Sequence, residues 1–599
     1  MAPRLASRLS ERMRVLPTRH KALLRAPRSL DTPARRCTLG TWRIDALLLV
    51  LLACTEIHLS GCGRGNAPAT QIAQGPHAPA VVPLPSPSNI LLITVDTLRA
   101  DHLSSYGYPR RTTPNLDRLA AEGVRFDQTA VQWPKTTPSF ASMFTATYSK
   151  DNDIVRKVGI PVSCRFEMLA KVLKRRGYAT QAVVSNGALG SEFNFDQGFD
   201  TYVETWKLTS HAGGNPNQAE AVTRLAVGLL DGLGREAHAG RPWFLWVHYI
   251  DPHFPYSPPG KWRDRFQGDR FADRSLKVPV SDRPKQQMGG IGREQVLDGH
   301  HDLAFYVARY DAAVAYADAE IGELLGEMRR RGLLGRTLTA FTSDHGESLG
   351  EHAYYFDHGR FGFQTCLRVP LILHYPGVLA PRVDRQPVEL LDLAPTLLEA
   401  AGAPLPGGAW KQGHSLTPRL RSLPPLAAAA GGTSGTSGTL GSSGSSETSG
   451  SSSVLGVPTV AAAVAAAAAA TAGEAAATAG PGPLAFSEAG WETNNKWQKA
   501  VRDGRFKLLV AQTYHEQRWI AGEGVEFALY DLVADPLETR NVADRHPVEL
   551  ERLKRALWAW DRAPRLDVET DPPTPACRPG QPKQIDPQTR ALLHSLGYL

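Results

Sequence analysis

Short apolar runs that alternate with longer segments of helical periodicity constrain the fold of this chain more than any other feature. The run at residues 90–95 reads ILLITV and is apolar except for one threonine. A strand with this pattern is buried on both faces, as in a parallel sheet that helices cover on each side. Similar strand-like runs occur later in the chain, at residues 179–184, 243–249, 338–341 and 369–374.

Helical patterns occupy intervals between these runs. One predicted helix covers residues 115–122, and a longer one covers residues 302–331, with Gly332 as its stop signal. Alternation of strands and helices is typical of a mostly parallel sheet. The sequence therefore predicts an α/β fold with a mostly parallel central sheet, in a domain that spans residues 89–422.

The C-terminal part of the chain predicts a smaller α+β subdomain at residues 484–599. Residues 499–510 alternate as a strand pair with a turn at Asp503 and Gly504, and residues 547–560 have an amphipathic helical pattern. Between the two parts, residues 423–483 consist of Gly-Ser-Thr repeats and an alanine tract. This composition offers no side chains for a core, so we interpret the segment as a low-complexity insertion without chemistry.

The first 62 residues have the features of an export signal. A basic stretch precedes an apolar run at residues 46–53, which is too short to cross a bilayer, and Leu59-Ser60-Gly61-Cys62 follows. These four residues resemble a bacterial lipobox, whose cysteine is lipidated after cleavage. We therefore expect a signal peptide with a lipobox at residues 1–62, lipid attachment at Cys62, and a Pro/Ala-rich flexible tether at residues 63–88.

Two alternatives stay open for the leader: a plain signal peptide with an incidental cysteine, and a weaker lipobox that ends at Cys54. The favoured interpretation predicts an exported, membrane-anchored lipoprotein on the periplasmic or cell-envelope side. Three cysteines remain after Cys62, and their spacing is not of a metal-binding type. Because their number is odd, the sequence implies no disulfide framework.

The formal net charge of +8 does not indicate a nucleic-acid-binding protein. Residues 1–61 hold eleven Lys or Arg against four Asp or Glu, so most of the excess lies in the predicted leader. Without the leader the chain is close to neutral, and the argument for a polyanionic partner from net charge disappears.

Carboxylate and imidazole side chains follow two of the predicted strands, at the edge where an open α/β sheet presents its ligands. Asp96 comes directly after the first strand, in VDTLRADH. Asp344 and His345 follow a later strand, in FTSDHGESLGEH, where Gly346 permits a sharp turn that lets both side chains reach one metal ion. This mixed set of oxygen and nitrogen donors suits a divalent cation.

Two further stretches carry side chains suited to group transfer. Thr136 lies in WPKTTPSFASMFTATY, where Pro138 precedes a helix-compatible run, and the amides of a helix N-terminus favour an anionic ester. Metal coordination is one way to activate a threonine hydroxyl. His253, in the Pro-flanked loop HYIDPHFPY, could donate a proton to a leaving oxygen, and His358 lies a short loop after the Asp-His pair.

Each of these features is common alone, because an Asp after a strand is usually a helix cap and an Asp-His pair is usually a turn. In this order, however, they resemble the sulfatase family of the alkaline phosphatase superfamily, including a His-Gly pair ahead of Leu367-Arg368-Val369-Pro370. The resemblance implies an alkaline-phosphatase-like sandwich with a small antiparallel sheet at its C-terminal end. It also implies three metal ligands, one nucleophile and two histidines around the transferred group: Asp96, Asp344 and His345, then Thr136, then His253 and His358.

The chain departs from the family pattern at several positions. Sulfatases carry Cys or Ser, oxidised to formylglycine, at the position of Thr136, and oxidation of a secondary alcohol gives a ketone instead of that aldehyde. The arginine of the family is Phe140 here, its second acidic residue is Thr97, and its Lys-x-His pair falls on Asn186 and Ala188. A threonine nucleophile is similar to that of the phosphodiesterases and phosphoethanolamine transferases of the same superfamily.

The sequence therefore predicts a metal-dependent hydrolase of sulfuric or phosphoric esters in the cell envelope, with Zn or Mn favoured as the metal and Ca as a further candidate. Two alternatives stay open: a transferase of phospho-groups to envelope glycans or lipids, and a catalytically inactive envelope binding protein. A second metal site from Asp251, His352 and His358 is also open. The predicted partners are an anionic ester substrate and the membrane, through the N-terminal lipid, and no nucleic acid is expected.

Overall fold

The computed structural model describes most of the chain that follows the predicted leader and tether. The described residues are 89–152, 154, 160–208, 215–269, 275–281, 289–406, 410, 412–422, 482–491, 496–513, 526–566 and 585–596. The predicted signal peptide, Cys62, the tether and almost all of the low-complexity segment lie outside these residues. The described residues belong to one unit, Ala78–Leu599.

In the described part of the chain, nine strands form the central sheet. The strand after which Asp96 stands, β1 (Asn89–Val95), lies between β8 and β5 and is parallel to both. The other strand that precedes a predicted metal ligand, β8, is therefore its direct neighbour. The order across the sheet is β12 (Arg382–Asp384), β2 (Val124–Ala130), β11 (Arg368–His374), β8 (Thr337–Ser343), β1, β5 (Trp243–Tyr249), β3 (Ala179–Val184) and β4 (Thr201–Glu204), with β13 (Val388–Glu389) paired to β2.

The prediction of a mostly parallel sheet is confirmed, with one strand that runs the other way. Strand β11 pairs antiparallel with β8 and with β2, whereas the other pairings in this sheet are parallel among the residues described. The run at residues 369–374 was correctly expected to be a strand, but its apolar pattern carries no information on direction.

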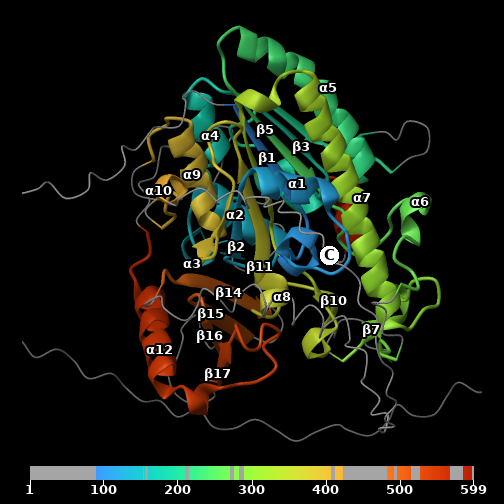
Figure 1. Ribbon diagram of the computed structural model, residues 1–599, viewed down its shortest axis with the longest axis vertical. Coiled ribbons are helices and arrows are strands. Elements are labelled where there is room, and N and C mark those ends of the chain that lie inside the picture. Colours follow the sequence, from blue (N-terminus) through green and yellow to red (C-terminus); the bar gives the residue numbers. More distant parts are fainter. Residues whose placement is uncertain are drawn as a thin grey trace, which may run out of the picture. The chain divides into compact units, whose positions relative to one another are not determined.

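Helices cover both faces of the sheet (Figure 1). This burial on two sides explains why the sequence of β1 is almost entirely apolar. Its residues Leu91, Ile93 and Val95 pack in the core that includes α1 (Pro114–Glu122), α5 (Ala219–His238) and α7 (Leu303–Arg330). The alternate residues Ile90 and Leu92 pack in the core of the opposite face, with α2 (Thr136–Thr145), α4 (Leu169–Arg175) and α9 (Leu393–Ala400). A strand with helices on both faces has no solvent-facing side that would favour polar residues.

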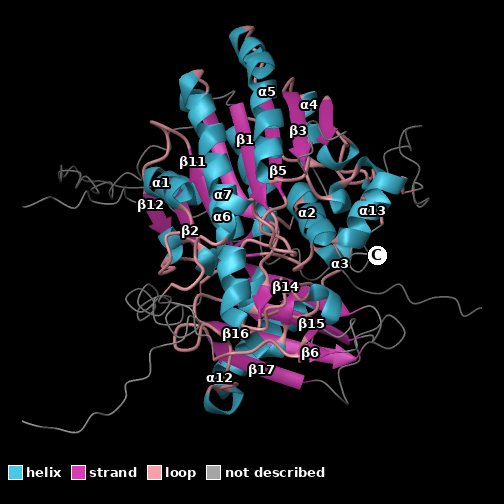
Figure 2. Ribbon diagram, turned by 90° about the vertical axis from the view of Figure 1, so that its right-hand side faces the viewer, coloured by secondary structure: helices cyan, strands magenta, loops and turns pink. Residues whose placement is uncertain are grey.

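A second, antiparallel sheet, formed by strands between residues 485 and 531, lies below the central sheet in Figure 2. Its order is β14 (Ala485–Trp491), β15 (Lys496–Arg502), β16 (Phe506–Thr513) and β17 (Glu526–Asp531). One face packs on α12 (Pro547–Arg562), where Leu508 and Leu529 join Leu553 and Leu557 in one cluster. Leu509, on the opposite face, belongs to the core of the central sheet. This sheet is therefore continuous with the larger core and does not fold around a core of its own alone.

The remaining elements are short or peripheral. The last helix, α13 (Pro587–Ser595), packs near Trp206, whose indole N–H donates to Thr589 Oγ1 at 2.8 Å. The other helices are α3 (Ser149–Asn152), α6 (Gly260–Arg263), α8 (Gln364–Leu367) and α10 (Thr417–Ser422). Two small strand pairs are β6 (Val280–Ser281) with β7 (Ile291–Gly292), and β9 (Ser348–Leu349) with β10 (Tyr355–Asp357).

One expectation about the cysteines was wrong. The sequence implied no disulfide framework, but Cys164 takes part in a disulfide. The odd number of cysteines did not exclude this, because one pair can form beside a free thiol. Cys366 is a buried free thiol. In the part of the chain that the structure describes, no helix combines the length and apolar character that a membrane crossing requires.

Candidate active site

Two neighbouring parallel strands end at the same edge of the sheet, and each delivers an acidic side chain there. Val95 of β1 pairs with Ser343 of β8, so Asp96 and Asp344 follow these strands side by side. His345 comes next, in a turn that leaves no room for a side chain at Gly346. A Cβ atom at Gly346 would lie 2.0 Å from the carbonyl oxygen of Thr365. The glycine thus permits the close approach that brings the Asp-His pair to one point.

Asp96, Asp344 and His345 form a buried triad suited to a divalent metal ion. Each offers one ligand atom, and these atoms lie within 4.8 Å of one another. His345 Nε2 is 3.3 Å from Asp344 Oδ2 and 3.9 Å from Asp96 Oδ1. Neither of these two buried carboxylate oxygens has a hydrogen-bond donor in the described structure. Buried anionic oxygens without a donor are costly, and a cation would satisfy both, so the residues present fit a metal ion.

The two carboxyl groups titrate in opposite directions. Burial would raise the pKa of Asp96, but hydrogen bonding to His248 and the other nearby imidazoles lower it to about 2. Burial and the adjacent charge of Asp96 raise the pKa of Asp344 well above its usual range. Two carboxylates cannot easily both ionise in one buried place without a positive charge between them. This electrostatic conflict is a second argument for a cation at the triad.

Thr136 is the first residue of α2, and its hydroxyl points to the triad. Its Oγ1 lies 3.3 Å from His345 Nε2. The helix start is tied to the loop of Asp344 and His345, because Ser139 Oγ donates to the Asp344 carbonyl at 2.6 Å. Lys135, directly before the helix, is half-buried, and its positive charge helps to lower the pKa of His345, whose main cause is burial. The arrangement presents a hydroxyl beside positive charge and a helix N-terminus, which favours an anionic group.

The two other predicted histidines lie next to the triad. The ring of His358 is 4.2 Å from that of His345 and 5.3 Å from that of His253, measured between centroids. His358 Nδ1 is 3.2 Å from Glu347 Oε1. Burial, then the neighbouring imidazoles, lower the pKa of His358 well below its usual value, and burial raises that of Glu347 well above its own. The structure thus brings all six predicted catalytic and metal-binding residues together.

Two residues at the site were not predicted as functional. Asn186 Nδ2 donates to Asp96 Oδ2 at 2.6 Å, and His248 Nε2 lies 3.4 Å from the same oxygen. His248 is fully buried, with its Nδ1 3.0 Å from Thr94 Oγ1 and its ring against Phe140. Their place in the sequence could have indicated this role, because Asn186 and His248 stand at the ends of the strands β3 and β5, at the same edge of the sheet as Asp96.

The alternative second metal site is not assembled. Asp251 accepts a hydrogen bond from the Ala219 amide at 3.0 Å, and the ring of His352 stacks on Phe363 at 3.7 Å. Within the described ranges, the triad of Asp96, Asp344 and His345 is the group of three or more potential ligands whose atoms meet.

The C-terminal sheet holds two loops next to predicted catalytic side chains. Before Thr136, Ser487 Oγ donates to the Val131 carbonyl at 2.6 Å, and the Glu488 amide donates to the Gln132 carbonyl at 2.8 Å. After His358, Gln498 Oε1 accepts from the Gly362 amide at 2.7 Å. These bonds connect strands β14 and β15 to main-chain atoms of the loops before Thr136 and after His358.

A buried ion pair strengthens the second of these connections. Lys507 on β16 pairs with Glu538, and each side chain is 1% exposed. Glu538 also accepts a hydrogen bond from the Gln364 amide at 2.6 Å, and Lys507 donates to the Gly362 carbonyl. The loop that carries His358 therefore rests on a charged, buried support from the C-terminal sheet.

A family model described as sulfatase matches residues 88–403, which is more than half of the chain. The chain belongs to the sulfatase family. The matched region contains the triad, Thr136, His253 and His358. The resemblance seen in the sequence is thereby confirmed at the level of the family, whose members are ester hydrolases.

Curated sulfatases show the same relationship. The chain is 29% identical to arylsulfatase A of Bos taurus over 377 residues, which are 54% of this chain and 65% of that protein. It is 27% identical to choline-sulfatase of Rhizobium meliloti over 511 residues, which are 77% of this chain and 84% of that protein. The match to arylsulfatase A thus spans about two thirds of that relative.

Solved structures of other proteins share the fold. The complex of BT4656 with its substrate D-glucosamine-2-N,6-O-disulfate has a TM-score of 0.55 at 20% identity and covers 81% of this chain and 100% of that one. The phosphonate monoester hydrolase of Agrobacterium radiobacter has a TM-score of 0.54 at 21% identity and covers 79% and 96%. The predicted fold class, a sulfatase-like α/β sandwich, is therefore confirmed.

Proposed function

We propose that this sulfatase-family chain hydrolyses phosphoric or sulfuric esters, with Thr136 as the nucleophile and with a divalent metal ion bound by Asp96, Asp344 and His345. The observation that carries the proposal is the position of Thr136 Oγ1, 3.3 Å from the metal-ligand imidazole and at the first residue of α2. Oxygen and nitrogen donors together favour Zn or Mn over Ca, which prefers oxygen ligands alone.

When bound, a divalent cation would supply positive charge that favours the ionised threonine hydroxyl and binds the oxygens of the ester. Thr136 Oγ1 gives up its proton to water and forms a bond to phosphorus or sulfur, while the bond between that atom and the ester oxygen breaks. The leaving oxygen takes up a proton, which His253 is placed to provide, while His358, whose low pKa keeps its ring neutral, can form a hydrogen bond to the transferred group. Water then attacks the phosphorus or sulfur atom, the bond from that atom to Thr136 Oγ1 breaks, and Oγ1 takes up a proton as the acid is released.

The chemistry of threonine favours a phosphoric ester as the better substrate. A hydrated formylglycine carries two hydroxyls on one carbon and can release the bound group by breaking its own carbon–oxygen bond. Thr136 has one hydroxyl on Cβ, so release of the group requires attack by water at phosphorus or sulfur. Attack of this kind at phosphorus is the usual course of phosphoryl transfer. The half-buried Lys135 beside Thr136 adds positive charge for either anionic ester.

The alternatives differ in the fate of the transferred group. A transferase would share the first step but use a hydroxyl of an envelope glycan or lipid in place of water. An inactive envelope binding protein would carry out neither step and would not need a bound metal ion. The clustering of six chemically competent side chains supports an enzyme over a binding protein.

The test is an assay of the protein without residues 1–62, loaded with Zn or Mn, on aryl phosphate, bis-aryl phosphate and aryl sulfate. We expect Thr136→Ala to lower kcat by at least ~10³-fold, because it removes the nucleophile, and Thr136→Ser to retain most of the activity. Thr145→Ala is the matched control, since the Thr145 hydroxyl, at the other end of α2, bonds the Ala141 carbonyl.

Four results would contradict parts of this proposal. Full activity of Thr136→Ala would exclude the threonine nucleophile. A preference for aryl sulfate would exclude the phosphoric ester as the better substrate. Absence of activity together with absence of bound metal would favour the envelope binding protein, and consumption of substrate only with an added alcohol acceptor would favour the transferase.

We also propose that the protein is exported and anchored by a lipid at Cys62, on the periplasmic or cell-envelope side. The lipobox-like sequence supports this location, and so does the disulfide at Cys164, because such bonds persist in oxidising compartments. Metabolic labelling with a lipid precursor tests it: Cys62→Ser should lose the label, and Cys54→Ser should keep it. A label that survives Cys62→Ser would contradict the anchor.

A further inference from the structure

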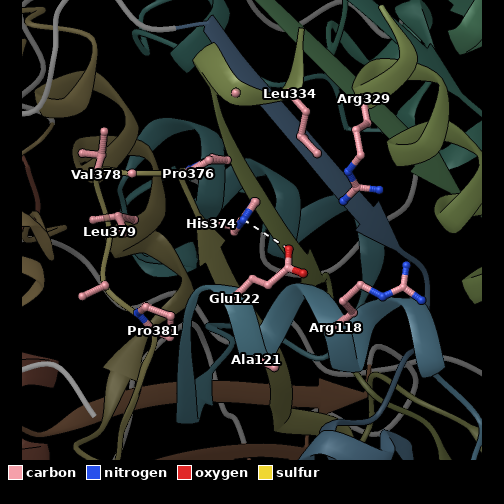
Figure 3. A pocket seen from close by; sticks show the side chains of 13 residues that line it. Arg118, Ala121, Glu122, Arg329, Leu334, His374, Pro376, Val378, Leu379 and Pro381 are labelled. Carbon is pink, nitrogen blue, oxygen red and sulfur yellow. Dashed lines mark ion pairs between the residues drawn. The ribbon is translucent and has the colours of Figure 1, made fainter. Parts of the chain in front are cut away.

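A cavity of about 930 Å³ lies at the edge of the central sheet opposite to the metal triad (Figure 3). Its floor includes His374, the last residue of β11, which pairs with Thr339 near the start of β8. The triad lies beyond the other end of β8, where Asp344 stands. From Thr339 to Asp344 the strand rises roughly 17 Å at about 3.3 Å per residue. The cavity is therefore separate from the candidate active site.

Two exposed arginines line this cavity, and their guanidinium groups have no ionic or hydrogen-bond partner among the described residues. Arg118 belongs to α1, and Arg329 belongs to the last turn of α7. The next residue of the same helix shows the contrast, because Arg330 pairs with Glu323 at 2.8 Å and with Glu327 at 2.6 Å. Two guanidinium groups on different helices thus present their donors at one cavity without a protein acceptor.

The third polar group is a buried imidazole. His374 is only 4% exposed, and its Nδ1 has no hydrogen-bond partner in the described structure. Its Nε2 faces Glu122 at 3.7 Å. Burial lowers the pKa of His374, so the ring is neutral and acts through hydrogen bonding. A buried imidazole nitrogen without a partner is costly unless a ligand or water completes it.

The walls are divided by chemistry, as Figure 3 shows. Arg118 and Arg329 lie on one side, Glu122 and His374 lie in the middle, and the apolar loop after β11 lies on the other side. A ligand would place acidic groups by the arginines, a hydroxyl by His374, and a carbon face on Val378 and Leu379. The volume is at the upper end of the range for small-molecule sites, which leaves room for two sugar-sized rings.

We propose that this cavity is a second, non-catalytic binding site for a hydroxylated organic dianion with the chemistry of an acidic disaccharide. The two unpaired guanidinium groups match two acidic groups of the ligand. The imidazole of His374 matches a ligand hydroxyl, which sulfate lacks. The proposal does not depend on the reaction at Thr136.

Digalacturonate is the probe, because it carries two carboxylates and several hydroxyls on two rings. Calorimetric titration of the purified protein should show one digalacturonate bound per chain, whereas the neutral disaccharide cellobiose should not bind. Arg329→Gln should weaken digalacturonate binding by at least ~10-fold, since a charge-assisted hydrogen bond is lost. Arg330→Gln is the matched control, because Arg330 is already paired and does not line the cavity.

Several outcomes would overturn this assignment. Absence of digalacturonate binding would do so, as would equal affinities of the Arg329→Gln and Arg330→Gln proteins. Sulfate binding as tight as digalacturonate binding would remove the role of the hydroxyls. Loss of binding in Asp344→Asn would show that the probe occupies the candidate active site instead, whereas unchanged binding in that variant would support a separate site.

Discussion

Asp96 is oriented by two side chains from strands that follow it far along the sequence. Asn186 and His248 both approach its Oδ2, which leaves Oδ1 free on the side of His345. Contacts of this kind fix the direction of a metal-binding carboxylate and tune its affinity for the ion. Asn186 also accepts a hydrogen bond from the Ala188 amide at 2.9 Å, so its amide group cannot rotate freely.

Asn186→Leu should therefore weaken the binding of Zn or Mn by roughly 10- to 100-fold, because the carboxylate of Asp96 loses the donor that orients it. Metal titration of the apo-protein, followed by calorimetry, measures the effect. Metal affinity equal to that of the unchanged protein would contradict the positioning role of Asn186.

A second expectation at the residue scale concerns Glu389, which is buried where β13 meets the C-terminal sheet. It accepts hydrogen bonds from Tyr148 Oη at 2.8 Å and from the Phe486 amide at 2.9 Å. Burial and the neighbouring carboxyl of Asp392 raise the pKa of Glu389 to about 8. The folded state therefore binds this proton more tightly than the unfolded state, so stability falls as pH rises from the unfolded pKa towards about 8.

Glu389→Gln removes this titration but keeps an oxygen for the Phe486 amide. Relative to the unchanged protein, the variant should gain about 1–3 kcal/mol in free energy of unfolding at pH 8.5, and little at pH 4.5. Urea unfolding at the two pH values measures the difference. If the variant is less stable than the unchanged protein by the same amount at both pH values, the titration of Glu389 does not contribute to stability.

At the scale of elements, strand β16 supports the loop of His358 through the buried pair of Lys507 and Glu538. Both side chains are almost fully buried, and Glu538 also accepts a hydrogen bond from the Gln364 amide. A buried charge that loses its partner is costly, although the net value of such a pair is small when both members are replaced. We therefore expect the main role of the pair to be a link between the C-terminal sheet and the loop of His358, with a small net contribution to the free energy of unfolding.

Lys507→Met should lower the free energy of unfolding by about 3–5 kcal/mol, because Glu538 stays buried without a counter-charge. The double variant Lys507→Met/Glu538→Gln should recover a large part of this loss, since it removes both charges and keeps an acceptor for Gln364. Guanidinium unfolding of the three proteins measures both effects. A double variant as unstable as the single one would contradict the electrostatic explanation.

At the scale of the whole molecule, the C-terminal sheet completes the larger core. Ala500, Leu509 and Tyr530 point away from α12 and belong to the same hydrophobic cluster as the helices on one face of the central sheet. A chain without this sheet would expose an apolar surface that is buried in the complete fold, together with the loops before Thr136 and after His358.

A protein that ends at residue 422 should therefore not fold cooperatively, although it contains every predicted catalytic and metal-binding residue. We expect it to aggregate or to bind the dye ANS and to lack a sharp thermal transition. A soluble fragment with a cooperative melt would show that the central sheet is independent of the C-terminal one.

The opposite result is expected for residues 423–481. Their Gly/Ser and alanine composition offers no core side chains, so replacement by a Gly/Ser linker of roughly 20 residues should change Tm by less than about 2 °C and leave kcat unchanged. Differential scanning calorimetry and the ester assay measure these quantities. A large loss of Tm would contradict the interpretation of this segment as an insertion.

The sequence by itself determined the elements whose pattern is local. A continuous apolar run such as that of β1 can be read without partners, and an acidic residue at the end of such a strand has a predictable place. The pattern of β2, VRFDQTA, is weaker, because this strand is polar on its partly exposed positions, and it was not predicted.

Only the tertiary structure decided which strands are neighbours, and several features of the molecule follow from that. Thr136 meets His345 across 209 residues, and Asn186 meets Asp96 across 90. The reversed direction of β11 places His374 and its cavity at the far edge of the sheet. The physical reason is that periodicity along a segment records which of its faces are buried, whereas strand order and direction depend on contacts between segments that are distant in the sequence.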